Sequence, residues 1–448
     1  MRKRKLGATI AVSLALSACS LAPQYQRPQM AVPPGWSNVA GVGASDQPST
    51  TPFWQDLGSD ELNNVMKLAL AQNLDLEAAL QRIDQARAQS KIAGSALFPS
   101  VEASGGASRS FQDPQNVSTA RGVGSISYEV DLWGRNRSNK AAANYRAKAT
   151  AFDYDALQLV VTSDTANFFT QALSLNQRIG IAENNLKNAE EILRIIEARY
   201  RAGAVSGLEV SQQRVAVNSF RASLISLIEA RSTNLNALAI LLGQAPQNLQ
   251  APAADLASLK LPAVNLTPPA TLLTARPDIE RAESLLRAAN ADIGSARAAF
   301  FPAMNLGLDA SMAAGFGNPA ASALSLASSV LAPIFTGGRL TGNLENVTAR
   351  QKELAAQYQK TVLVAFQEVE DALATLKSSN EQAALSRESV TESQSAYNIA
   401  KARFDAGAID YLTLLETQRS LYQAEDNQIA INAEQLRSFV QLRKALGA

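Results

Sequence analysis

Proline placement is the feature of this sequence that most limits its fold. No proline lies between Pro114 and Pro246, and none follows Pro333. Because proline disrupts helix interiors, these two tracts are where long uninterrupted helices can form. Both are rich in alanine, leucine, glutamine, glutamate and arginine, which favour helices. Apolar residues recur at three- and four-residue spacing, for example over 189–200 and 362–373, which predicts amphipathic helices that bury one face.

A short phrase occurs once in each tract. ARYRAGAVS at 198–206 returns as ARFDAGAID at 402–410. In both copies a glycine follows an arginine-containing turn, as at helix C-termini, and Ser206 or Asp410 then suits the N-cap of another helix. We therefore expect each phrase to be the tight tip of a helical hairpin. Helices are expected over residues 61–97, 135–201, 208–242, 277–299, 340–404 and 411–446.

A wider comparison of the two halves indicates internal duplication. Residues 75–99 align with 278–302, and both segments end in Phe-Pro, while DLWGR at 131–135 aligns with FTGGR at 335–339. Both pairs of segments are separated by nearly the same number of residues, which is the signature of a repeated unit. The expected parts are a signal peptide (1–18), an extended N-terminal segment (19–60), a first repeat (61–244), a proline-rich linker (245–274) and a second repeat (275–448). Each repeat is expected to hold a helix, a strand hairpin and a long helical hairpin.

Each repeat also contains segments with the period-two pattern of strands. Apolar and polar residues alternate over 126–132 and 304–312. The segments 100–112 and 302–315 do not alternate strictly throughout, and 320–332 follows the pattern more weakly still. Two hairpins of strands of roughly 10–13 residues are predicted, long enough to cross a membrane. Their connections are expected over 113–116 and 315–319.

Four strands cannot form a membrane barrel by themselves. The smallest transmembrane barrels have about eight strands, and open sheet edges are not tolerated in lipid. Several chains must then share one barrel. Two chains would give eight strands and a filled interior, whereas three would give twelve strands and room for a pore.

The N-terminus has the pattern of a secretory signal. Basic residues from Arg2 to Lys5 precede an apolar stretch over 6–16 that is too short to span a bilayer. Leu16-Ser17-Ala18-Cys19 then resembles the lipobox of bacterial lipoproteins, whose cysteine carries a diacylglycerol and an N-acyl chain. As the single cysteine, Cys19 cannot form an internal disulfide. An ordinary signal peptide with an incidental cysteine is the alternative. By resemblance to lipoprotein sorting, Ser20 indicates the outer membrane.

Composition argues against several classes of function. The chain has no histidine, which excludes histidine-based acid–base catalysis, Ser-His-Asp and Cys-His nucleophiles and the usual zinc sites. No enzyme activity, metal or cofactor is expected besides the lipid on Cys19. Lys and Arg number 41 against 40 Asp and Glu, and four of the former lie in the signal peptide, so no basic surplus favours nucleic acid as a partner. No later apolar run is long enough for a transmembrane helix.

Taken together, these stretches resemble the outer-membrane factor family of tripartite efflux systems, the TolC/OprM-like channels, in its lipoprotein (NodT-type) branch. The residues that carry the resemblance are CSLAPQYQRP (19–28), ALAQNLDLEAAL (69–80), ARPDIERAE (275–283), FFP (300–302), PIFTGGRL (333–340) and the two tip phrases. The resemblance implies a mostly α fold in which duplicated helical hairpins form a periplasmic α-barrel. Four strands per chain would contribute to a shared 12-stranded transmembrane β-barrel in a homotrimer.

The implied function is a passive exit duct in the outer membrane of a Gram-negative bacterium. It would pass drugs or other small solutes from the periplasm to the exterior. A periplasmic adaptor protein would grip the tips, and an inner-membrane pump of the RND type would supply the energy. The exported substrate and the cognate adaptor are not indicated by the sequence.

The resemblance also assigns roles to particular residues. Leu412 and Glu416 match the family's periplasmic gate and lie on one helix face, with Glu209 as a weaker candidate. A coiled-coil core position for Leu412 and a solvated face for Glu416 are the alternatives. The adaptor-contacting tips would be Gly203, Ala204, Val205, Ser206, Gly407, Ala408, Ile409 and Asp410. The strand-to-helix turns would be Trp133, Gly134, Gly337 and Gly338, with Trp133 either an interfacial anchor or a packing residue.

Two other classes of protein compete with the channel interpretation. A periplasmic lipoprotein adaptor also has a lipobox and a helical hairpin, but it normally has one hairpin between β-rich halves. A periplasmic enzyme on a helical scaffold would need a cluster of catalytic groups, which the sequence does not display. The duplication and the paired strand hairpins favour the channel.

Overall fold

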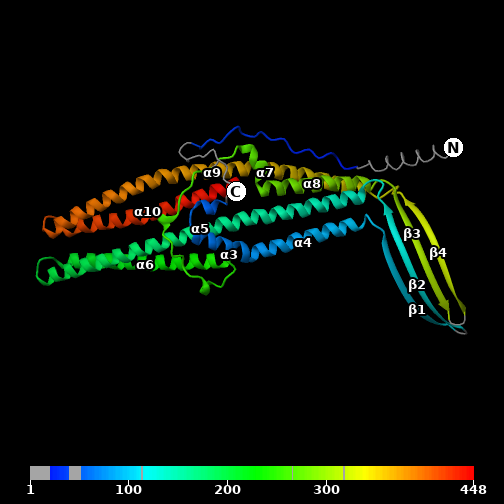
Figure 1. Ribbon diagram of the computed structural model, residues 1–448, viewed down its shortest axis with the longest axis horizontal. Coiled ribbons are helices and arrows are strands. Elements are labelled where there is room, and N and C mark those ends of the chain that lie inside the picture. Colours follow the sequence, from blue (N-terminus) through cyan, green and yellow to red (C-terminus); the bar gives the residue numbers. More distant parts are fainter. Residues whose placement is uncertain (1–20, 40–51, 113–114, 265, 316–317, 448) are drawn as a thin grey trace. The chain divides into compact units, whose positions relative to one another are not determined.

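The computed structural model describes residues 21–39, 52–112, 115–264, 266–315 and 318–447 and is mostly helical, with four strands in one sheet (Figure 1). The helices are α2 (Phe53–Asp56), α3 (Asp60–Gln72), α4 (Leu74–Ser95), α5 (Arg135–Arg201), α6 (Gly207–Leu241), α7 (Leu272–Ala275), α8 (Pro277–Ala298), α9 (Arg339–Asp405) and α10 (Tyr411–Leu446). The strands are β1 (Ser100–Gln112), β2 (Gln115–Val130), β3 (Ala303–Gly315) and β4 (Asn318–Leu331). Within the described part of the chain, no helix combines the length and the apolar character that a bilayer span requires.

The two long helical hairpins are confirmed. α5 and α9 each have 67 residues, and they are followed by α6 with 35 and α10 with 36. Each hairpin turns at a glycine with positive φ, Gly203 at 77° and Gly407 at 73°. The following amide closes the helix end, because Ala204 donates to the carbonyl of Arg199 at 2.9 Å and Ala408 to that of Arg403 at 2.8 Å.

The single helix expected over 61–97 is wrong, because Asn73 divides it into α3 and α4. Asn73 is extended, with φ −66° and ψ 121°. Its side-chain oxygen accepts hydrogen bonds from the amides of Asp75 and Leu76 at 3.0 Å each, and its amide nitrogen donates to the carbonyl of Leu241 at 2.9 Å. Asparagine competes for backbone hydrogen bonds in this way, so it ends one helix and caps the next.

The four strands form one antiparallel sheet in the order β1-β2-β3-β4. The two predicted hairpins are present, and the pairing of β2 with β3 joins the two repeats over Thr119–Gly315 to Val130–Met304. The connections expected over 113–116 and 315–319 are too long, because β2 begins at Gln115 and β4 at Asn318. Antiparallel pairing continues nearly to the chain reversal, since each added pair satisfies further backbone groups.

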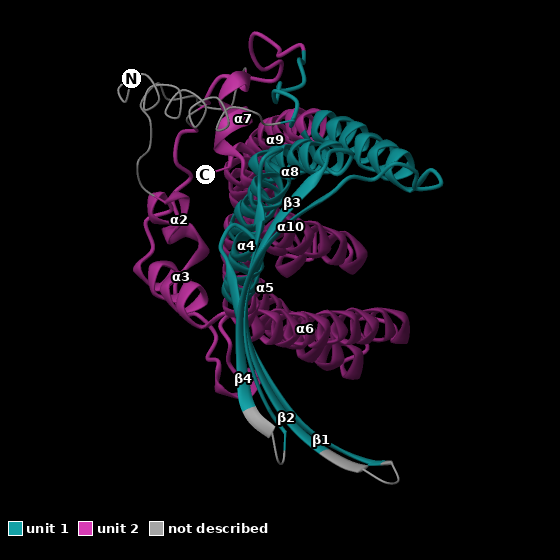
Figure 2. Ribbon diagram, turned by 90° about the vertical axis from the view of Figure 1, so that its right-hand side faces the viewer, with its two compact units in different colours: residues 1–30, 79–154, 278–361 teal, residues 31–78, 155–277, 362–448 magenta. Residues whose placement is uncertain are grey.

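The chain divides into two compact units (Figure 2). One unit comprises residues 1–30, 79–154 and 278–361, and it holds the sheet and α8. The other comprises residues 31–78, 155–277 and 362–448, and it holds α3, α6, α10 and the linker. The long helices α5 and α9 contribute to both units. Each unit therefore combines equivalent pieces of both repeats, rather than one repeat each.

The two helical hairpins share a hydrophobic core near their tips. This tip core, defined by its buried residues, consists of Ala189, Ile196, Val210, Ala216, Val217, Phe220, Ala400, Phe404, Tyr411, Leu414 and Leu415. Farther along α9, the expected stripe over 362–373 is buried at Val362, Phe366, Val369 and Leu373. In the stripe over 189–200, Ala189 and Ile196 are buried and Ile192 is partly buried, but Tyr200 near the tip is exposed. The periodicity thus marks the buried face correctly except at the tip.

The linker between the repeats is held by polar contacts rather than by regular structure. Its described residues include the short 3-10 helices Pro246–Asn248, Leu256–Ser258 and Pro269–Thr271. The carboxylate of Glu61 accepts from the amides of Ala253 at 3.1 Å and Ala254 at 3.0 Å, and Trp36 donates to the carbonyl of Thr267 at 2.8 Å. Such side-chain partners satisfy backbone groups that a loop leaves unpaired.

Replacing Asn73 by alanine should destabilise the protein by about 1–2 kcal/mol, because the cap of α4 and the partner of the Leu241 carbonyl are both lost. The measurement is the free energy of unfolding of the purified protein in detergent. Asn64→Ala is the matched control, since Asn64 is exposed on α3. Equal effects of the two substitutions would show that the hydrogen bonds of the Asn73 side chain add nothing to the free energy of unfolding.

Candidate functional site: the hairpin tips and the strand sheet

The first hairpin tip is closed by a capping box. The Ser206 hydroxyl accepts from the amide of Leu208 at 3.2 Å, while the Glu209 carboxylate accepts from the Ser206 amide at 3.0 Å and from the Ser206 hydroxyl. The hydrogen bond from the Ser206 side chain, followed by bonds from backbone amides, lowers the pKa of Glu209 below its usual range. The Glu209 carboxylate is therefore bound to the start of α6 in the single chain.

The second tip uses a different cap. Asp410 accepts from the amide of Thr413 at 2.9 Å and from its hydroxyl at 2.6 Å, and these bonds lower the pKa of Asp410. Glu416 lies one turn farther along α10 and takes no part in the cap. The two tips thus place their carboxylates differently although their backbones turn alike.

The candidate gate residues lie on an outward face of α10. Leu412 is 47 % exposed, and Glu416 is exposed one turn later. The neighbouring Tyr411, Leu414 and Leu415 are the residues that enter the tip core. Among the described residues, no hydrogen bond or ion pair holds the Glu416 carboxylate. In one chain, both side chains are therefore available to a surface outside it.

The eight candidate adaptor contacts separate into exposed and packed positions. Gly203, Ala204, Gly407 and Ala408 are exposed, and so are the caps Ser206 and Asp410. Val205 and Ile409 are partly buried against the tip core. Each tip therefore presents a small exposed backbone segment that is fixed from behind by one branched aliphatic side chain.

Sequence reasoning missed the polar ties that connect the two hairpins. The Tyr411 hydroxyl donates to the side-chain oxygen of Gln213, whose nitrogen donates to the carbonyl of Ala189 at 2.6 Å. Gln213 is fully buried, and burial raises the pKa of Tyr411. No local signal finds such a pair, because a glutamine on a helix gives no indication of the element it will face.

Two further ties lie along the same hairpins. Arg178 on α5 makes a two-point ion pair with Asp426 on α10, at 2.7 and 2.9 Å. The hydroxyls of Ser223 on α6 and Tyr422 on α10 are 2.9 Å apart. We call these three contacts, Tyr411–Gln213, Arg178–Asp426 and Ser223–Tyr422, the hairpin ties. Planar paired contacts of the Arg178–Asp426 kind are the stronger class of charged hydrogen bond.

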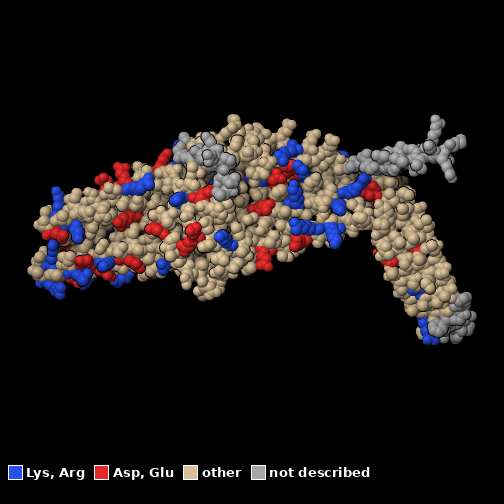
Figure 3. Space-filling model, viewed as in Figure 1, with Lys and Arg blue, Asp and Glu red and all other residues tan. Residues whose placement is uncertain are grey.

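The sheet has one apolar and one polar face. Directly opposite residues share a face, and one row across the four strands reads Val101, Ile126, Leu308 and Leu326. The adjacent row, on the other face, reads Glu102, Ser125, Asp309 and Ser325. The leucine and valine side chains of the first row are exposed at Val101 and Leu326. Figure 3 shows few charged side chains on the viewed side of the sheet, in contrast to the helices.

The strand-to-helix turns need glycine, and Trp133 packs there. Gly134 has φ 74°, while Gly337 and Gly338 have φ 57° and 84°, which only glycine adopts without strain. The Trp133 ring stacks on Phe301 at 4.7 Å between centroids, and its nitrogen donates to the carbonyl of Pro302 at 2.9 Å. Trp133 therefore joins the end of the first strand hairpin to the start of the second.

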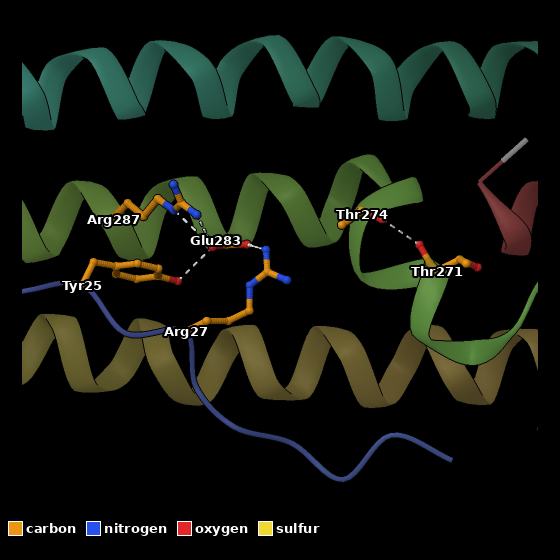
Figure 4. Close-up of polar contacts among 6 residues, drawn as sticks. All are labelled: Tyr25, Arg27, Thr271, Thr274, Glu283 and Arg287. Carbon is orange, nitrogen blue, oxygen red and sulfur yellow. Dashed lines mark hydrogen bonds and ion pairs between the residues drawn. The ribbon is translucent and has the colours of Figure 1, made fainter. Parts of the chain in front are cut away.

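An N-terminal strap, residues 21–28, lies along α8 in the sheet-containing unit (Figure 4). The buried carboxylate of Glu283 pairs with Arg27 and Arg287 and accepts from the Tyr25 hydroxyl at 3.2 Å. Burial raises the pKa of Glu283, but the hydrogen bonds and charges of Arg27 and Arg287 together outweigh burial and leave the pKa below its usual range. Burial, followed by the charge of Glu283, raises the pKa of Tyr25 to about 12. The structure thereby joins two stretches, 19–28 and 275–283, that carried the family resemblance.

The family is settled by comparison with known proteins. The family model described as "Outer membrane efflux protein" matches residues 65–244 and 269–448, which is most of the chain. The chain belongs to the outer membrane efflux protein family. The resemblance seen in the sequence is thereby confirmed.

Relatives and solved structures cover nearly the whole chain. The pyoverdine export outer membrane protein OpmQ of Pseudomonas aeruginosa is 36% identical over 456 residues, spanning 98% of this chain and 95% of the relative. The toluene efflux pump outer membrane protein TtgF of Pseudomonas putida is 34% identical over 462 residues, spanning 98% and 96%. The outer-membrane channel OprN matches with TM-score 0.88 at 27% identity, over 96% of this chain and 99% of that one. CusC matches with TM-score 0.84 at 28% identity, over 96% and 100%.

This outer membrane efflux protein is thus an outer-membrane channel of an efflux pump, and the channel interpretation is confirmed over the adaptor alternative. The family is one of channels rather than of enzymes. The signal peptide and Cys19 lie outside the described residues, so lipid attachment stays a prediction. The gate and adaptor-contact residues also stay predictions, now with known positions in the chain.

Replacing Glu283 by glutamine should release the strap, because the two guanidinium groups lose their buried counter-charge at a cost of about 1–3 kcal/mol. Amide hydrogen exchange of residues 21–28 should become faster, and Glu345→Gln, exposed on α9, should leave it unchanged. Since the pKa of Glu283 lies below the ordinary value of about 4.3, its contribution is present above that pH. The contribution is lost as the pH falls through the lowered pKa. Slow exchange in Glu283→Gln at neutral pH would contradict the role of this carboxylate.

Proposed function

We propose that three copies of this chain form the exit duct of a tripartite efflux pump. The observation that carries the proposal is the sheet, which has four strands, one apolar face and two open edges. A sheet of this kind can lie in lipid only when both edges are paired with other chains. Three copies supply twelve strands, and the serine-, glycine- and alanine-rich polar face leaves space inside them.

The tips provide the control point of the duct in this proposal. Two tips per chain would place six around a threefold axis. Leu412 and Glu416 are exposed on α10 in a single chain. In the proposed trimer this face of α10 is turned toward the threefold axis, so three copies would bring three carboxylates together there. Like charges placed close together repel one another and concentrate cations, which favours a narrow, cation-attracting entrance.

The exposed Gly-Ala segments of the tips are the proposed contact with a periplasmic adaptor. Small side chains allow another backbone to approach closely, and the caps at Ser206 and Asp410 hold these segments in one conformation. An inner-membrane transporter, of the RND type in this proposal, would supply the energy. We assign cargo selection to that pump, since two channels of this one family have the different named cargoes pyoverdine and toluene.

Lipidation of Cys19 fits the course of the strap. Arg297 near the end of α8 donates to the carbonyl of Leu21 at 3.3 Å, and Asn290 donates to that of Pro23 at 2.7 Å. Cys19 precedes Leu21 by two residues in the sequence. A lipid on Cys19 would therefore lie near the junction of α8 and β3, within the unit that holds the sheet.

The test of the duct is single-channel recording of the purified protein in planar bilayers, together with its mass in detergent. A trimer-sized particle with discrete conductance steps is the expected result. A monomer without conductance would refute the shared-sheet argument.

Glu416→Gln should reduce cation selectivity by roughly twofold or more, because a ring of three negative charges at the entrance is removed. Reversal potentials in a salt gradient measure this change. Glu209→Gln is the control, since the Glu209 carboxylate is bound in the capping box of the other tip. Selectivity that falls only in Glu209→Gln would place the acidic ring on the first tip instead.

Tyr411→Phe should favour the open state, because it removes one hairpin tie and leaves the side-chain oxygen of Gln213 without its donor. The loss of one hydrogen bond, about 0.5–1.5 kcal/mol, corresponds to a shift of roughly 2- to 10-fold in the closed–open equilibrium. Open probability in bilayer recordings measures the shift. Tyr200→Phe is the control, because Tyr200 is exposed near the other tip. An unchanged open probability in Tyr411→Phe would exclude this tie from gating.

A further inference from the structure

Four apolar side chains at the helix-side end of the sheet have no cover within the chain. Ile334 is 93 % exposed and Phe335 90 %, in the segment that follows β4. Val101 at the start of β1 is 75 % exposed, and Phe98 just before it is 68 % exposed. These residues lie at the two outer strands, β4 and β1, which are the open edges of the sheet.

The duplication supplies a template for covering them. In the repeat, Phe98-Pro99 corresponds to Phe301-Pro302, and β1 and β3 both have 13 residues. The first hairpin begins with the pair Ser100–Ser127 and the second with the pair Ala303–Leu331. β3 is therefore the equivalent of β1, and β4 is the equivalent of β2.

The junction between β2 and β3 is consequently the intrachain copy of a junction between β4 and another chain's β1. In the intrachain ladder, Val130 lies opposite Met304. By the same correspondence, which also aligns Arg135 with Arg339, Val130 is equivalent to Ile334 and Met304 to Val101. The transferred register places Ile334 opposite Val101 of the partner subunit.

We propose that β4 of one subunit pairs with β1 of the next in this register, and that the pairing extends β4 through residues 332–334. This inference rests on the proposed trimer and specifies its seam. β2 continues to Val130, the equivalent of Ile334, because β3 supplies partners there, whereas β4 ends at Leu331 in the single chain. Pro333 is compatible with the extension, since a proline is tolerated at strand ends where its nitrogen faces away from the ladder.

The same register explains exposed apolar residues at the other end of the seam. Ala120 lies opposite Ala314 within the chain, and their equivalents are Leu324 and Phe111. Leu324 is then opposite Phe111 of the partner subunit. Both residues are exposed in the single chain and lie on the apolar face. One register therefore pairs apolar residues at both ends of the seam.

Phe335 is assigned to the partner's Phe98. Within the chain, Trp133 covers Phe301, but the equivalent of Trp133 is Gly337, which has no ring. Phe335, two residues earlier, is the exposed aromatic residue of that turn. In the proposed register it lies opposite Ser100 of the partner subunit, next to the partner's Phe98. Phe335 therefore covers the partner's Phe98, from a position two residues before the equivalent of Trp133.

Cysteine cross-linking tests the register. Because Cys19 is the single cysteine, the pair Val101→Cys with Ile334→Cys in one chain gives a clean background. Mild oxidation of the detergent-purified channel should link subunits covalently in denaturing gels, and each single variant should not. Val101→Cys with Val330→Cys, on the same face but four residues away, is the control and should stay unlinked.

The outcomes distinguish the seam from the trimer itself. A trimeric mass with efficient linkage in the control pair and none in the first pair would overturn the register and leave the proposed function intact. A monomeric mass for both unoxidised variants and for the unmodified chain would refute the proposed function as well.

A double-mutant cycle tests the aromatic contact. Phe335→Ala and Phe98→Ala should each lower the temperature at which the trimer dissociates, and the double variant should lower it little further than either one. Ile195→Ala, at an exposed position on α5, is the control for loss of an exposed aliphatic side chain. Fully additive shifts for Phe335→Ala and Phe98→Ala would show that the two rings do not touch.

Discussion

Backbone hydrogen bonding in lipid is the constraint on which the rest of this channel depends. Every N–H and C=O group at membrane depth must be paired, and the sheet leaves the outer edges of β1 and β4 unpaired. Its apolar rows favour lipid on one face, while small polar residues line the other. The duplication meets this constraint economically, because the β2–β3 junction inside the chain already has the form that a junction between chains requires. A ring built from such subunits repeats one type of strand junction, formed by β2 and β3 within each chain and by β4 and β1 between neighbouring chains.

The two hairpin tips show how a duplicated structure separates its roles. Both turn at a glycine with positive φ, and both begin the next helix with a side-chain cap. The first cap engages Glu209, whereas the second engages Asp410 and Thr413 and leaves Glu416 outside it. A change in cap chemistry thus decides which carboxylate is left outside the cap of its tip. The hairpin ties then hold the second hairpin to the first through polar groups that are buried at Tyr411–Gln213 and partly buried at the other two ties.

The sequence predicts what local chemistry determines and misses what depends on a distant partner. The absence of proline and the glycine tips place α5 and α9 to within a residue or two, because both signals act on the backbone nearby. Asn73 is missed as a break: its cap on the amides of Asp75 and Leu76 is local, but the bond from its side-chain nitrogen to the carbonyl of Leu241 in another helix leaves no trace in the nearby sequence. The β2–β3 pairing and the Tyr411–Gln213 contact are missed for the same reason. Periodicity shows that a face is buried but not which element covers it.

The strap shows that residues far apart in the sequence can contact each other and still lie in stretches that the sequence alone marks as characteristic. Two of the stretches that carried the family resemblance meet where Tyr25 and Arg27 contact Glu283. The strap approaches α8 so closely that a Cβ on Gly294 would lie 2.6 Å from the Cβ of Ala22, so a glycine is required there. A buried carboxylate is stable only with its counter-charges in place, and one of these comes from the strap itself. Docking of the strap therefore depends on a folded α8, and it holds residues 21–28 beside the helix that leads into β3.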